Sequence, residues 1–232
     1  MPTKVLDTRQ EQPWFRRLYL PTYKVRDAAR YAGTSPQSVA NWHYRGEPVL
    51  PGRKRRRPLN YLELVEVAFV AFFRKHDVPM SRIRNAIKYL AQYFGKENPL
   101  VEYEFKTEGM HILMEYNKFD PDTSLERLVV TDRFGQLAWS DLFKGKFAEF
   151  DYEYEIALRW HPAGRDSLVL IDPRIAFGAP MVHGLPTWVL KGRWNAHETF
   201  SEIQDEFGLP EQAVRDGLVF EGIKLNGDSV LG

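Results

Sequence analysis

Apolar residues recur three and four positions apart through much of the first half of the chain, which is the spacing of one face of an α-helix. This spacing predicts a long helix over residues 59–74, buried along one broad stripe, and a second helix over residues 78–90. In the second helix, Ile83, Ile87 and Leu90 should face the core.

After Gly95-Lys96-Glu97-Asn98-Pro99 the pattern changes from helical to alternating. Single residues separate the apolar side chains of Tyr103 and Phe105, and later those of Ile112, Met114 and Tyr116, while residues 128–131 are rich in β-formers. Alternation is typical of strands with one buried face. It predicts a small antiparallel sheet in a middle segment, residues 97–166.

In the last third of the chain, glycine and proline residues between positions 171 and 193 separate two short predicted strands. Residues 199–220 then predict a helix, a Gly-Leu-Pro turn and a second helix. Their expected core residues are Ile203, Phe207, Leu209, Val214 and Leu218. The chain as a whole is therefore predicted to be α+β, with helix-turn-helix-like helices at both ends.

Residues 25–42 have the spacing of a helix-turn-helix. Ala29 is small enough for two helices to cross closely, and Gly33 permits a tight turn between them. Ser35 is placed to cap the second helix, and Pro36 to start it. Val39 and Trp42 fall on one face of that helix and should point inward.

The outer face of the second helix is polar, and polar side chains there could contact base edges and phosphates in a major groove. An ordinary helical hairpin with a solvated face is the alternative. A run of basic residues, bracketed by Pro51, Gly52 and Pro58 like a hairpin wing, favours DNA. The predicted DNA-binding residues are Gln37, Ser38, Asn41, Tyr44, Arg45, Arg53, Lys54, Arg55, Arg56 and Arg57.

Charge is distributed unevenly along the chain, although the formal net charge is only +1. Residues 1–57 hold 13 Lys or Arg against 4 Asp or Glu, a net of +9, and the remaining residues hold 19 against 27, a net of −8. Nucleic acid should therefore meet the front of the chain, because each neutralised phosphate releases a counterion.

The order of helix, turn, helix, basic wing and two further helices, with Arg57 and Tyr61 ahead of a long apolar helix, resembles the MerR-type winged helix-turn-helix domain over residues 20–95. The resemblance implies DNA binding. Activator members of that family carry a long dimerisation coiled coil and an effector pocket, often with cysteines. This chain has neither heptads nor a cysteine, which excludes a thiol-based sensor and a disulfide framework.

Residues 168–223 resemble the small VapB-type antitoxin domain, also known as domain of unknown function four hundred and thirty-three. The resemblance rests on the Asp-Pro-Arg opening at Asp172, the Gly-x-Pro at Gly178, His183-Gly184 and the late helix-turn-helix. Leu185-Pro186-Thr187-Trp188 departs from the pattern, which has an arginine there. The resemblance implies an antitoxin that neutralises a PIN-like ribonuclease toxin while the complex represses its own operon.

Residues 197–222 carry seven acidic side chains and one basic side chain, so this second helix-turn-helix suits a protein partner better than phosphates. The expected partner-binding residues are Arg174, Trp188, Glu211 and Arg215. A solvated helical pair that covers hydrophobic surface or builds a dimer is the alternative.

No enzyme chemistry is expected. The six histidines lack helical zinc-site spacing, and no phosphate-binding glycine loop or nucleophile elbow occurs. Asp151, Glu153 and Glu155 fit one strand with a wet face better than a metal-binding hydrolase site. We expect no catalytic residue, metal or cofactor, and with no signal peptide or apolar span, a bacterial cytoplasmic protein that is nucleoid-associated when bound to its operator.

The sequence thus predicts an autoregulating antitoxin, acting as a homodimer on an inverted-repeat operator and without contact to a membrane. The alternative is a stand-alone transcriptional regulator whose middle and C-terminal parts sense a ligand or mediate oligomerisation.

Overall fold

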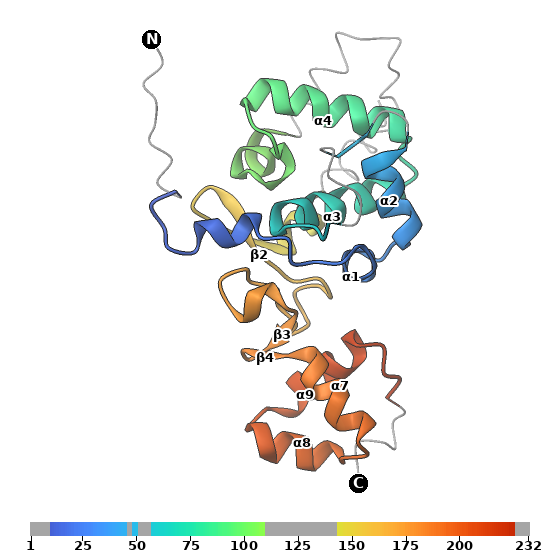
Figure 1. The fold of residues 1–232 in the computed structure, drawn as a ribbon, viewed down its shortest axis with the longest axis vertical. Coiled ribbons are helices and arrows are strands. Elements are labelled where there is room, and N and C mark those ends of the chain that lie inside the picture. Colours follow the sequence, from blue (N-terminus) through green and yellow to red (C-terminus); the bar gives the residue numbers. More distant parts are fainter. Residues whose placement is uncertain (1–9, 46–47, 51–56, 110–142, 226–232) are drawn as a thin grey trace. The chain divides into compact units, whose positions relative to one another are not determined.

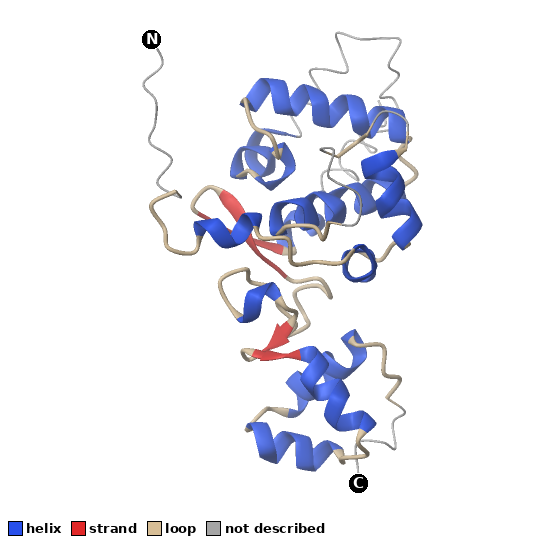
Figure 2. Ribbon diagram, viewed as in Figure 1, coloured by secondary structure: helices blue, strands red, loops and turns tan. Residues whose placement is uncertain are grey.

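The computed structural model describes residues 10–45, 48–50, 57–109 and 143–225. The chain divides into two compact units, residues 1–158 and 159–232 (Figure 1). Helices dominate both units, and each contains short paired strands, which confirms the predicted α+β class (Figure 2). The three-part division into residues 20–95, 97–166 and 168–223 stays a prediction.

The first unit is built around helix α3 (Tyr61–Lys75), which follows α1 (Val25–Tyr31) and α2 (Pro36–Tyr44). Positions 61–71 of α3 are all buried, so the helix is enclosed rather than covered along a single stripe. Its neighbours include α1, α4 (Met80–Phe94) and the short 3-10 helices η1 (Phe15–Tyr19) and η2 (Pro99–Val101). Ile83, Ile87 and Leu90 of α4 are buried, as predicted.

An aromatic cluster fills the space on one side of α3. The ring of Phe69 stacks on that of Phe150 with a centroid distance of 5.1 Å, and it meets Phe105 edge to face at 5.4 Å. Phe147, from a helical segment at residues 143–148, packs 5.6 Å from Phe69. The cluster therefore joins α3 to segments far along the chain.

Part of the predicted middle sheet is wrong. Tyr103 lies in a helical turn, and Phe105 begins the short helix η3 (Phe105–Gly109), because its side chain is buried against Phe69 instead of lining a strand face. The predicted strand residues at 112–116 and 128–131 lie outside the described residues.

The expected single strand through the acidic residues 151–155 is a hairpin instead. Strand β1 (Phe150–Glu153) pairs with β2 (Ile156–Trp160) through a two-residue turn. Tyr154 and Glu155 in that turn have φ values of +52° and +60°, the left-handed conformation that tight hairpins require. Neither residue is a glycine or asparagine, so the sequence carried no ordinary turn signal.

The second unit combines one short hairpin with three helices, of which the first and the third contact the strands. Strands β3 (Met181–Val182) and β4 (Leu185–Pro186) pair antiparallel, followed by α7 (Thr187–Asn195), α8 (Phe200–Phe207) and α9 (Glu211–Phe220). Two short strands between positions 171 and 193 and the last two helices were predicted, whereas α7, which occupies the end of that range, was not. The core contains Val169, Val182, Leu190, Phe200, Ile203, Leu209, Ala213, Val214 and Leu218, with Phe207 partly buried against it.

Within the described ranges, no helix has both the length and the apolar character needed to cross a bilayer.

Candidate nucleic-acid interface

Helices α1 and α2 form the predicted helix-turn-helix. Ala28 and Ala29 of α1 are fully buried where α2 packs against it. The chain turns at Gly33, which has a φ of +64°, a conformation that glycine adopts without steric cost. Val39 and Trp42 are buried on the inner face of α2, as the spacing predicted.

The start of α2 follows the predicted capping pattern. The Ser35 hydroxyl accepts a hydrogen bond from the backbone N–H of Ser38 at 3.0 Å, and Pro36 occupies the first turn. Both features fix the first turn of the helix, which is the part that a recognition helix presents to base edges.

The outer face of α2 carries a pair of side-chain amides. Gln37 Nε2 donates a hydrogen bond to Asn41 Oδ1 at 2.9 Å, one helical turn away. The bond holds the two amides in one orientation, with the carbonyl oxygen of Gln37 as an acceptor and the amino group of Asn41 as a donor. Ser38 and Tyr44 are half-buried, and Arg45 is exposed at the end of the helix.

Backbone hydrogen bonds fix the chain on both sides of the basic run, residues 53–57. Before the run, the N–H groups of Val49 and Leu50 donate to the carbonyl of Trp42 at 2.9 and 3.3 Å. After it, Leu59 pairs with Tyr23, which precedes α1, through N···O distances of 2.6 and 2.9 Å. Arg53, Lys54, Arg55 and Arg56 lie outside the described residues, so their predicted DNA contacts stay predictions.

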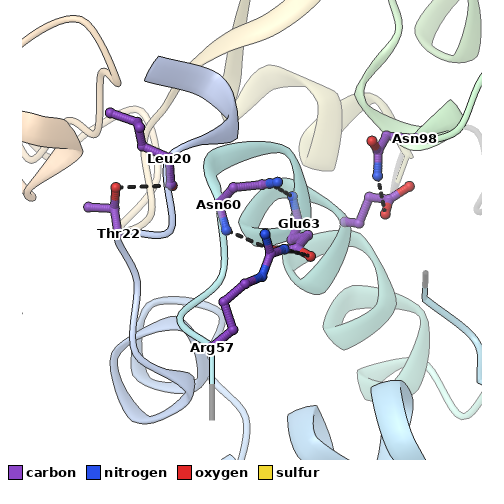
Figure 3. Close-up of polar contacts among 7 residues, drawn as sticks. Leu20, Thr22, Arg57, Asn60, Glu63 and Asn98 are labelled. Atoms are coloured by element: carbon purple, nitrogen blue, oxygen red, sulfur yellow. Dashed lines mark hydrogen bonds and ion pairs between the residues drawn. The ribbon is translucent and has the colours of Figure 1, made fainter. Parts of the chain in front are cut away.

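Arg57 lies within the described residues, and its guanidinium forms an ion pair with Glu63 of α3 (Figure 3). Arg57 Nη2 donates to Glu63 Oε1 at 2.7 Å, while Glu63 Oε2 accepts the backbone N–H of Asn60 at 2.7 Å. The Asn60 side chain accepts the N–H of Glu63 in return, which completes a capping box at the start of α3. Sequence reasoning missed Glu63, although Asn-x-x-Glu before an apolar run is the signal for such a box.

A second glutamate lies one turn further along α3. Glu66 is fully buried, and Asn98, just after α4, donates a hydrogen bond to its Oε2 at 2.9 Å (Figure 3). The pKa of Glu66 is raised to about 8, mainly by burial; the hydrogen bond from Asn98 opposes the rise, and the nearby charges of Glu63 and Glu97 add to it. The carboxyl group is therefore mostly uncharged at neutral pH.

Three of the four predicted partner-binding residues form ion pairs within the second unit. Two guanidinium nitrogens of Arg174 donate hydrogen bonds to the buried carboxylate of Asp172, the shorter at 2.7 Å. The first and last residues of the Asp-Pro-Arg sequence are therefore paired with each other. Arg215 Nη2 donates to Glu211 Oε1 at 2.9 Å along α9. Trp188 is 63% exposed on α7. Partner contacts by these residues stay predictions.

The structure adds one exposed aromatic residue that sequence reasoning missed. Phe177 is 80% exposed, and its φ of +53° is uncommon for a bulky side chain. Such backbone conformations cost on the order of 1–3 kcal/mol and persist only where the surroundings enforce them. No sequence signal indicates this conformation, because Phe177 lies beside Gly178 in a segment that reads as an ordinary turn.

The acidic residues of the β1–β2 hairpin lie on one strand and in the turn that follows it. In the part of the chain that the structure describes, no group of three or more His, Cys, Asp or Glu side chains is placed to hold a metal ion. Asp151 and Glu153 are half-buried on β1, and Glu155 is exposed in the turn.

Comparison with known proteins extends the picture over most of the chain. No protein-family model matches it. The chain is 25% identical over 231 residues to a Mycobacterium tuberculosis (strain ATCC 25618 / H37Rv) protein named "Putative antitoxin VapB45", and the alignment covers 87% of this chain and 94% of that protein. The similarity agrees with the VapB type expected from residues 168–223.

The fold also matches a solved structure, titled as the X-ray crystal structure of Rv2018 from Mycobacterium tuberculosis. The TM-score is 0.75 at 24% identity, over 87% of this chain and 99% of that chain. The solved structure supports the fold of the chain and carries no functional statement.

Proposed function

We propose that this protein is the antitoxin of a type II toxin–antitoxin system, which neutralises a PIN-like ribonuclease toxin and represses its own operon by binding operator DNA. The observation that carries the proposal is the similarity to the protein named as putative antitoxin VapB45, because it extends over 87% of this chain and therefore reaches both units. The protein acts by occupancy of its partners, as a homodimer, without a cofactor.

In the proposal, the first unit binds DNA. The capped start of α2 and the amide pair of Gln37 and Asn41 support base contacts, because one donor and one acceptor held together match the edge of adenine. The basic run supplies charge for phosphates. One such head reads a short site, so a two-fold dimer on an inverted repeat is the expected arrangement.

The second unit, in the same proposal, binds the toxin. Its supporting features are the exposed rings of Trp188 and Phe177, since large exposed aromatic residues are enriched at the centres of protein interfaces. The acidic balance of residues 197–222 disfavours a second DNA contact. Exposed Glu211 and half-buried Arg215 on α9 are rim candidates.

The decisive experiment is to co-express the chain with the product of the adjacent gene, purify by a tag on one of them, and test the eluate on a fragment of their own promoter. Co-elution and a shifted fragment are expected. A growth assay tests the antitoxin role. The adjacent gene product is induced alone and then together with this chain, and the chain should relieve the growth arrest. If the arrest persists with both proteins present, the antitoxin proposal is wrong.

Matched variants separate the two activities. Gln37→Ala combined with Asn41→Ala should lower affinity for the promoter on the order of 10-fold or more while affinity for a scrambled fragment changes little, because base contacts specify. Trp188→Ala should weaken co-elution of the toxin and leave the promoter shift intact. Tyr93→Ala, which removes a 57% exposed ring from α4, is the control and should change neither.

A stand-alone regulator that senses a ligand is the second candidate. A cavity of roughly 190 Å³ in the first unit favours it, lined by residues that include Phe15, Tyr19, Lys96 and Glu102. Rings, an amine and a carboxylate around one cavity are suited to a small polar metabolite with an apolar body. A promoter shift by the purified chain, with no toxic or co-eluting neighbour, would favour this candidate over the antitoxin.

A further inference from the structure

Glu63 makes two contacts at once, and they join elements that the capping box alone would not join. One carboxylate oxygen completes the cap of α3, and the other holds Arg57, the last residue of the basic run. The Glu63 side chain is only 7% exposed, while that of Arg57 is 38% exposed. A well-buried carboxylate thus fixes a guanidinium that still reaches the surface.

The position of Arg57 explains why this contact matters for the chain around it. Two residues later, Leu59 is paired with Tyr23, which directly precedes the first helix of the helix-turn-helix. The chain at the end of the basic run is therefore held at two points: Arg57 contacts Glu63 of α3 (Figure 3), and Leu59 pairs with Tyr23 before α1. Earlier in the chain, Val49 and Leu50 donate hydrogen bonds to the α2 carbonyl of Trp42.

We infer that Glu63 is a positioning residue for DNA binding, which holds Arg57 and the exit of the basic run in a fixed place beside the helix-turn-helix. This inference rests on the proposed function, because it assumes that the first unit binds operator DNA. Glu63 itself does not touch DNA in this arrangement. It acts through Arg57. Its negative charge alone would lower the affinity for DNA, whereas its hold on Arg57 raises that affinity.

The difference in sign gives a sharp test. Glu63→Gln removes one negative charge from the DNA-binding unit, so simple electrostatics predicts tighter binding to phosphates. Glutamine can still accept the N–H of Asn60 and complete the box, so the start of α3 is kept. Loss of the charge weakens the hold on Arg57, and the positioning role therefore predicts weaker binding, on the order of 5- to 10-fold at fixed salt.

Binding of the full chain to its own promoter fragment is measured over a series of NaCl concentrations for the wild type, Glu63→Gln, Arg57→Gln and the double variant. Glu149→Gln is the matched control, because it also removes a negative charge from an ion pair of the first unit, with Lys146 at 2.6 Å. Its affinity should stay unchanged or rise. Arg57→Gln should weaken binding, and adding Glu63→Gln to it should have no further effect.

The salt dependence separates positioning from a lost phosphate contact. Glu63→Gln should leave the slope of log affinity against log salt unchanged, whereas loss of one phosphate contact in Arg57→Gln lowers its magnitude by about 0.9. Thermal melts of each variant identify any that fail to fold. If Glu63→Gln fails to fold, Arg57→Gln, which changes a half-buried residue and leaves Glu63 in place, carries the test alone.

Equal or tighter binding by Glu63→Gln, or full additivity in the double variant, would overturn the inference and leave the proposed function standing. If Arg57→Gln carries the test, unchanged affinity in that variant would do the same. A wild-type chain that does not bind its promoter would overturn both.

Discussion

Gly217 in α9 lies where the second unit has no room for a side chain. A Cβ atom added there would lie 2.5 Å from Cδ1 of Leu190 on α7, and 3.6 and 3.7 Å from methyl groups of Val182 and Thr187. Carbon atoms normally approach to about 3.5–4.0 Å. Gly217→Ala therefore forces Leu190, which is fully buried, to move against its neighbours.

Two effects of opposite sign decide the result of Gly217→Ala. Overpacking in a core costs about 1–3 kcal/mol, whereas alanine in place of glycine stabilises a helix by up to about 1 kcal/mol. We expect a net loss of about 1 kcal/mol in the free energy of unfolding of the second unit. Gly192→Ala is the control, because Gly192 lies in α7, is exposed and has no atom within 4 Å of the added Cβ. It should gain about 0.5–1 kcal/mol.

The assay is hydrogen exchange of peptides from residues 187–221 in the full chain, because two compact units need not unfold together and a single melting curve would mix them. Gly217→Ala should accelerate exchange in these peptides, and Gly192→Ala should slow it. Adding Leu190→Val, which lacks a Cδ atom, should abolish the cost of Gly217→Ala. Equal protection in the two alanine variants would refute the packing argument.

Three further predictions concern single residues. The pKa of buried Glu66 is about 8, so folding takes up a proton between about pH 5 and 8, and the wild type loses stability as pH rises through this window. Glu66→Gln should remove this loss. In urea titrations, its unfolding free energy relative to the wild type should grow by on the order of 3 kcal/mol from pH 5.5 to 8.5. A difference that stays constant with pH would argue against a raised pKa of Glu66. Ser35→Ala removes the cap of α2 and should lower the stability of that helix by about 1 kcal/mol. Hydrogen exchange in residues 36–44 should then be roughly fivefold faster, and unchanged exchange would mean that the cap is not needed. Phe177→Gly relieves a left-handed backbone at an exposed site and should stabilise the second unit by up to about 1 kcal/mol in the same exchange assay, whereas a loss would show that the ring packs against the protein.

The sequence predicted those parts of the fold that depend on neighbouring residues. Periodicity located α3 and α4, and the Ser-Pro pair located the start of α2, because caps and amphipathic faces are local properties. Helix α7 was missed because the stretch Trp188–Arg193 contains a glycine and a β-branched residue, which weaken a helical pattern, and its helical state depends on burying Leu190 against α9.

Other features depend on contacts between distant residues, and the sequence could not place them. Phe69 and Phe105 were separated by 36 positions, so the turn of helix at Phe105 was read as a strand. The candidate site shows the same division. The amide pair on α2 follows from helical spacing, whereas the bond between Asn98 and Glu66 joins residues 32 positions apart and needed the folded chain.

The two helix-turn-helix arrangements of this chain also show why shape alone does not assign a DNA-binding role. Helices α8 and α9 are joined by a short turn like that between α1 and α2, yet the acidic side chains around them serve the fold of their own unit. Glu202 accepts the N–H of Thr199 in a capping box, which lowers the pKa of its carboxyl group, and Asp216 accepts the N–H of Leu168 at 2.7 Å. The negative charges that accept these N–H groups would repel the phosphates of DNA. The residues that stabilise the second unit therefore disfavour phosphate contacts there, which is why the proposed function assigns operator binding to the basic first unit.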